Sequence, residues 1–129
     1  MAAAPAPLDR RYTDSHEWHK VEGGLVVLGI TQFAVDQLTD ITYVQMKAKG
    51  TKFKKGDSVG EVESVKATSD IYAGIAGEIA EVNAALGDNP GLLNTDPYAK
   101  GWLIKIKPAN APDVEGLLSA ADYNKKYAG

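Results

Sequence analysis

The stretch GEVESVKATSDIYAGIAGEI, residues 60–79, decides the fold that we expect for this chain. Strand-forming residues on both sides of Lys66 predict strands at residues 58–65 and 70–75, and a further strand follows at residues 78–83. Small polar residues after the lysine favour a tight turn. The pattern therefore predicts a hairpin with a lone lysine at its tip.

Position alone leaves two interpretations of Lys66 open. Lysine is usually a solvated surface amine. Its flexible four-carbon stem also suits the attachment of a carboxylic cofactor through an amide. The chain has no cysteine, which excludes disulfides, thiol nucleophiles and thiolate metal ligands, so any sulfur chemistry has to arrive on a cofactor.

Length and charge narrow the class of protein. With 129 residues, 44% of them hydrophobic, the chain can build one domain with a real core. A net charge of −3 without a basic cluster among aromatics argues against nucleic-acid binding. No apolar run approaches the roughly 20 residues that span a bilayer, and the start of the chain lacks a secretory signal. We expect a cytoplasmic monomer without a membrane partner, its domain at residues 9–129 after a flexible tail at residues 1–8.

The other segments predict short strands with small helices around them. Further strands are expected at residues 16–22, 25–30, 41–46 and 102–107, the last with Trp102, Ile104 and Ile106 on one face. Thr31 is expected to cap a helix of about two turns. The spacing of Val114, Leu117, Leu118 and Ala121 predicts a helix that begins near Pro112, and a second one pairs Tyr123 with Tyr127. The fold class that follows is mainly β with peripheral helices.

Two histidines flank Glu17 but do not indicate a metal site. His16 and His19 are three residues apart, so on a strand their side chains point to opposite faces and cannot share an ion. Nor do they supply an acid, base and nucleophile constellation for an enzyme. Trp18 and Trp102 are expected to be packing aromatics.

Several segments resemble one known family in the same order along the chain. They are GEVESVKATSDIYAGIAGEIAEVN at residues 60–83, YTDSHEW at 12–18, GIT at 29–31, NTDPYAKGWLIKIKP at 94–108 and LLSAADY at 117–123. Together they cover roughly residues 9–127 and resemble the glycine cleavage system H-protein family. The resemblance implies a barrel-sandwich hybrid of the lipoyl- and biotinyl-carrier type with a C-terminal helical segment.

The resemblance also implies a function. Members of this family are carriers and not enzymes, and the lysine of an E-S-V-K-A segment bears lipoate. Carried over to this chain, Lys66 is the attachment residue and Glu63, Ser64, Val65 and Ala67 complete the attachment motif.

The implied partners are three enzymes and a lipoylating enzyme. The P-protein, a glycine decarboxylase, loads an aminomethyl group onto the lipoyl arm, and the T-protein, an aminomethyltransferase, removes it. The L-protein, a dihydrolipoyl dehydrogenase, reoxidises the dithiol, and a lipoate ligase or octanoyltransferase attaches the arm. The family places the loaded arm in a cleft, and the matching residues here are Ser15, Glu17 and Asp70.

Three positions depart from the family pattern. Thr39 stands where many relatives have glycine, Gly74 stands where proline is common, and Gln37 stands where some have histidine near the cleft. We expect glycine at position 74 to make the hairpin that presents Lys66 more flexible than proline would. Two alternatives stay open, a member that mainly relays lipoyl groups to other enzymes and a lipoyl domain of the 2-oxoacid dehydrogenase type. A biotin carrier fits less well, because Lys66 lacks flanking methionines.

Overall fold

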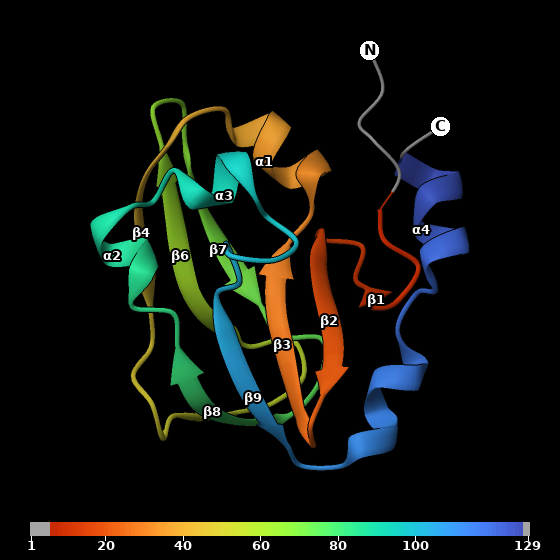
Figure 1. Ribbon diagram of the computed structural model, residues 1–129. Coiled ribbons are helices and arrows are strands. Elements are labelled where there is room, and N and C mark those ends of the chain that lie inside the picture. Colours follow the sequence, from red (N-terminus) through yellow and green to blue (C-terminus); the bar gives the residue numbers. More distant parts are fainter. Residues whose placement is uncertain (1–5, 128–129) are drawn as a thin grey trace.

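The computed structural model describes residues 6–127, and within them the strands form two antiparallel sheets (Figure 1). The larger sheet has the order β1 (Arg11–Tyr12), β2 (Glu17–Glu22), β3 (Leu25–Ile30), β9 (Ile104–Pro108), β8 (Gly77–Val82) and β5 (Lys52–Phe53). The smaller sheet has the order β4 (Ile41–Met46), β6 (Ser58–Ser64) and β7 (Thr68–Tyr72). The helices are α1 (Gln32–Leu38), α2 (Ala85–Asp88), α3 (Leu92–Thr95), η1 (Ala111–Gly116) and α4 (Ala120–Tyr127). The predicted fold class is confirmed.

The hairpin of β2 and β3 lies within the larger sheet, where β3 also pairs with β9. Gly23 and Gly24 make its turn with φ of 57° and 83°, values that favour glycine. Strand β3 is buried on both faces, which explains its continuous apolar run in place of an alternating one. Val26 and Leu28 face the main core between the sheets, whereas Val27 faces a second cluster under the N-terminal segment and α4.

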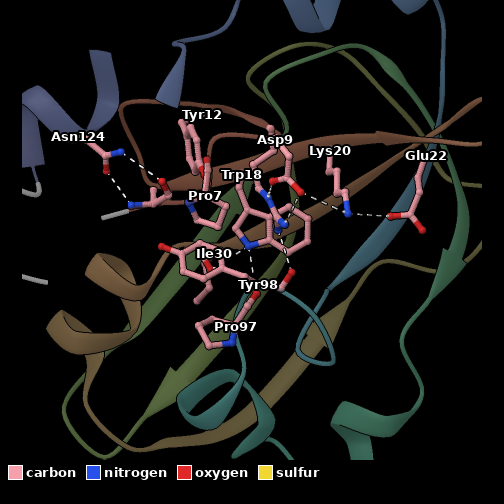
Figure 2. A network of polar contacts seen from close by, with 12 residues as sticks. Pro7, Asp9, Tyr12, Trp18, Lys20, Glu22, Ile30, Pro97, Tyr98 and Asn124 are labelled. Carbon is pink, nitrogen blue, oxygen red and sulfur yellow. Dashed lines mark hydrogen bonds and ion pairs between the residues drawn. The ribbon is translucent and has the colours of Figure 1, made fainter. Parts of the chain in front are cut away.

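Trp18 anchors the second cluster. Its indole Nε1 donates to the carbonyl oxygens of Ile30 and Pro97, both at 3.1 Å (Figure 2). The ring packs so tightly on Gly29 that a Cβ there would lie 2.4 Å from it. The guanidinium carbon of Arg10 lies over the same ring, 4.6 Å from its centroid. Trp18 is thus a packing aromatic, as predicted.

The N-terminal segment is fastened to the C-terminal helix. Ala6 is buried, and its backbone N–H donates to Asn124 Oδ1 at 2.7 Å while Asn124 Nδ2 donates back to its carbonyl at 3.2 Å (Figure 2). The structure therefore holds the chain from Ala6 onward, before the predicted boundary of the domain. Residues 1–5 of the predicted tail lie outside the described residues.

Two sequence expectations near the C-terminus are wrong. Trp102 precedes β9 and packs in the second cluster, while Ile104 and Ile106 are in the main core. The single helix expected from Pro112 ends at Gly116, because Leu118 pairs with Tyr12 through two backbone hydrogen bonds of 2.8 Å. Helix α4 begins only after this bridge, and its Tyr123 and Tyr127 rings pack at 4.9 Å as expected.

The end of α1 carries backbone strain at Thr39. The predicted cap is present, since Thr31 Oγ1 accepts the Ala34 N–H, but the other end of the helix has Thr39 at φ 64° and ψ −143°. This region is essentially restricted to glycine, and a β-branched residue there is costly. Asn94 holds the loop by donating to the Thr39 carbonyl at 2.9 Å and accepting the Ile41 N–H at 3.0 Å.

We predict that Thr39→Gly stabilises the protein. Removal of the Cβ relieves the strained φ, and we expect the free energy of unfolding to rise by about 1 kcal/mol in chemical denaturation. Thr39→Ala is the control, because it keeps the Cβ and should gain much less. A Thr39→Gly protein no more stable than the Ala variant would contradict this account.

Candidate functional site

Lys66 lies in the tight turn that joins β6 and β7. Glu63 and Thr68 pair across the strands, and the Ser64 N–H donates to the Ala67 carbonyl at 2.8 Å, so Val65 and Lys66 are the central turn residues. Neither has a positive φ. The hairpin stands at the upper left of Figure 1, far from the termini on the right. The predicted position of the lysine at a hairpin tip is confirmed.

The hydroxyl of Ser64 holds this turn. Its Oγ accepts the N–H groups of Lys66 at 3.2 Å and Ala67 at 3.0 Å, and it donates to the Ala67 carbonyl at 3.1 Å. The Val65 N–H donates to the Asp40 carbonyl at 3.0 Å, which fastens the tip to the segment after α1. The turn was expected to be held by the polar residues after Lys66, but these lie in β7. The root of the lysine is therefore fixed while its side chain is exposed.

A cleft of about 530 Å³ lies at the far end of β7. Its lining combines the loop before β2, the end of β7 and the segment before α4: Tyr12, Thr13, Asp14, Ser15, Glu17, Lys55, Gly56, Tyr72, Ala73, Gly74, Gly116, Leu117, Leu118 and Asp122. The lining has three carboxylates, those of Asp14, Glu17 and Asp122, and one lysine, Lys55, and Asp14 also forms an ion pair of 2.9 Å with Lys126. This balance of charge suits a cationic group better than an anionic one.

Glu17 is buried at the base of the cleft, with 1% of its surface exposed. Its Oε1 accepts the hydroxyls of Thr13 at 2.5 Å and Ser15 at 2.6 Å, and its Oε2 accepts the Tyr72 N–H at 3.3 Å. Burial raises the pKa of this carboxyl by more than the three donors lower it. Glu17 is therefore not an ordinary exposed strand residue.

The structure brings two of the three predicted cleft residues together. Ser15 and Glu17 line the cleft, but Asp70 faces a separate hollow of about 240 Å³ on the smaller sheet. Asp70 reaches the cleft through Tyr72, whose hydroxyl donates to its Oδ2 at 3.5 Å. Asp70 belongs to β7 and not to a turn. It lies on the same face of the strand as Tyr72, and β7 runs from the Lys66 turn to the cleft.

Sequence reasoning missed Thr13 and Tyr72 as partners of Glu17. Thr13 lies within the YTDSHEW segment, and its spacing from Glu17 was the signal that could have revealed it. Tyr72 is 55 residues away from Glu17, and only the packing of the two sheets makes them neighbours. Gln37 is exposed on α1 and does not line the cleft, contrary to its expected position.

The two histidines bond to different parts of the protein. His16 Nδ1 lies 2.8 Å from the Tyr123 hydroxyl, and His19 Nε2 accepts the Gly74 N–H at 3.0 Å. Within residues 6–127, no three His, Asp or Glu side chains gather as a metal site would require. In the same part of the chain, no helix is long and apolar enough to cross a membrane.

The fold and the exposed turn lysine define a carrier domain of the lipoyl- and biotinyl-carrier type, in which a small β sandwich holds one lysine on a hairpin. The family model "Glycine cleavage H-protein" matches residues 10–128. The chain belongs to the glycine cleavage H-protein family, as the sequence segments indicated.

Individual relatives agree with this assignment. The glycine cleavage system H protein of Listeria monocytogenes serotype 4a (strain HCC23) is 47% identical over 119 residues, 92% of this chain and 95% of its own. That of Acinetobacter baumannii (strain ATCC 17978) is 49% identical over 117 residues, 91% and 94% of the two chains. The crystal structure of the Mycobacterium marinum H protein superposes with a TM-score of 0.86 at 42% identity, over 94% of this chain and 98% of that one.

We predict a pH signature for Glu17. Since its pKa is raised in the folded state, the protonated form stabilises the fold below the unfolded-state pKa, and this contribution is lost as the pH rises through the folded-state value. The free energy of unfolding of the unsubstituted protein, relative to Glu17→Gln, should therefore fall as the pH rises from below the unfolded-state pKa to above the folded-state pKa of Glu17.

Denaturation at several pH values measures this difference. Glu115→Gln, which removes an exposed carboxylate of η1, controls for the change in net charge. A difference between Glu17→Gln and the unsubstituted protein that does not change with pH would show that burial does not govern this carboxyl.

Proposed function

We propose that Lys66 carries lipoate in amide linkage and that the chain is a lipoyl carrier of glycine cleavage. The turn geometry supports this most directly, because an exposed amine on a fixed root suits a group that must swing between active sites. When bound, lipoate supplies a dithiol that accepts an aminomethyl group, a chemistry that a chain without cysteine cannot provide itself.

The residues at the turn fit such a group. Glu63, Ser64, Val65 and Ala67 form the attachment motif around the lysine, and Val65 exposes 69% of its surface beside it. We propose that a lipoate ligase or octanoyltransferase recognises this tip. The apolar Val65 side chain and the rigid Ser64 turn are the features available to such an enzyme.

The cleft fits a protonated amine. Strand β7 leads from Lys66 to the cleft, and Asp70 lies on the way. We place the amine beside Ser15 and Glu17, where the buried carboxylate offers a charge-assisted hydrogen bond and the walls exclude water that would hydrolyse the cargo. The negative balance of the lining favours a cation over a neutral group.

The proposed partners follow from this cargo. We propose that the chain acts as a cytoplasmic monomer that receives the aminomethyl group from a P-protein, delivers it to a T-protein, and presents the dithiol to an L-protein. The chain itself supplies attachment, protection and release. No catalytic residue is assigned to it.

We predict that lipoylation occurs at Lys66. Co-expression with a lipoate ligase in medium containing lipoate should add one lipoyl group, and peptide mapping should find it on Lys66. Lys66→Arg should abolish the adduct, whereas Lys55→Arg, which changes another exposed lysine beside the cleft, should keep it. An adduct that survives Lys66→Arg would refute the assignment.

Glycine cleavage and lipoyl relay give different results with the lipoylated protein. In glycine cleavage, the lipoylated protein and a P-protein should exchange the glycine carboxyl with labelled bicarbonate, and the Lys66→Arg protein should not. If exchange fails while lipoyl groups pass to other acceptor proteins, the relay role is correct and the proposed function is wrong.

A further inference from the structure

Two side chains of β2 hold the free edge of β7 at regular spacing. Glu17 Oε2 accepts the Tyr72 N–H at 3.3 Å, and His19 Nε2 accepts the Gly74 N–H at 3.0 Å. The acceptors are two residues apart on β2, and the donors are two residues apart at the end of β7 and just after it. Since residues i and i+2 share one face of a strand, these bonds form a short ladder made by side chains.

The ladder occupies an edge that the smaller sheet leaves unpaired. Strand β7 pairs only with β6 in the order β4-β6-β7, so the backbone N–H groups on its outer side need other acceptors. Gly74 follows β7 and is buried. A Cβ at Gly74 would lie 2.8 Å from Thr13 Cγ2, 2.9 Å from Leu117 Cδ2 and 3.1 Å from His19 Cε1. Gly74 is therefore enclosed and its N–H is bonded, while its loosening relative to proline stays a prediction.

The position of His19 determines its protonation. Its side chain is fully buried, and burial lowers the pKa of the imidazole to about 3, so it is neutral at ordinary pH. Because Nε2 accepts a hydrogen bond, the ring proton lies on Nδ1. That nitrogen has no hydrogen-bond partner among residues 6–127. The protein thus tolerates one unpaired donor in order to supply an acceptor to Gly74.

We propose that His19 is a positioning residue of the cleft. Its hydrogen bond keeps residues 72–74, which form one wall of the cleft, attached to β2 while Glu17 binds the amine of the aminomethyl group. Glu17 Oε2 accepts the Tyr72 N–H and Glu17 also lines the cleft, so an amine that docks there would share this acceptor and weaken its bond to Tyr72. The hydrogen bond of His19 is not shared in this way, because within the described part of the chain His19 Nε2 accepts only the Gly74 N–H. This inference rests on the proposed function of the cleft.

The hydrogen bond itself is tested on the protein without lipoate. Nitrogen-15 NMR of the imidazole should show Nδ1 protonated and Nε2 bare, and His19→Leu should accelerate exchange of the Gly74 amide by about tenfold or more. His19→Gln, whose amide oxygen can replace Nε2 as acceptor, should restore much of the protection. A protonated Nε2 would overturn the inference, as would unchanged exchange in His19→Leu.

The positioning role is tested on the lipoylated protein loaded with aminomethyl cargo, by the rate of formaldehyde release. His19→Leu should release it several-fold faster with unchanged lipoylation at Lys66, and His19→Gln should stay close to the unsubstituted protein. Ile79→Val, in the main core, is the control for loss of stability alone and should not change the rate.

The outcomes separate the two proposals. If the unsubstituted protein releases formaldehyde as fast as the free lipoyl compound, the proposed protection by the cleft is wrong. If it protects the cargo and His19→Leu protects it equally, only the role of His19 is wrong. Should His19→Leu fail to fold, the imidazole NMR of the unsubstituted protein and the rate of His19→Gln still decide the matter.

Discussion

The carboxylate of Glu17 joins the two sheets, and the site depends on this contact. A buried charge is costly unless hydrogen bonds compensate it. Three donors offset part of that cost here, the hydroxyls of Thr13 and Ser15 and the N–H of Tyr72. The first two belong to the loop before β2 and the third to the edge of β7, so one side chain fixes the loop, the strand and the base of the cleft together.

In the proposed function, attachment and protection lie at opposite ends of one strand. The turn before β7 holds Lys66 by its backbone and leaves its amine in solvent, and the end of β7 forms a wall of the acidic cleft. Strand β7 joins the turn to the cleft, so in the proposed function only the arm would need to move. The same strand edge is covered by Glu17 and His19, which also shields it from pairing with another chain.

Much of the fold could be predicted from local sequence patterns. The hairpin around Lys66, the turn at Gly23 and the cap at Thr31 follow from residue preferences that act over a few positions. The helix expected from Pro112 failed because Leu118 pairs with Tyr12, which lies more than a hundred residues away. Local spacing cannot reveal a competing partner so distant in the sequence. Asp70 was assigned to the cleft from the family resemblance, and the structure places it in a separate hollow.

The sequence by itself determined the class of fold, the lysine on its hairpin and the resemblance to the family, because these depend on short-range preferences and contiguous motifs. Only the tertiary structure decided which side chains share the cleft. It showed that Glu17 is buried, that the Tyr72 N–H is the third donor to its carboxylate, and that His19 accepts the N–H of Gly74. Those contacts arise where two sheets pack, and the geometry of that packing is a property of the whole chain.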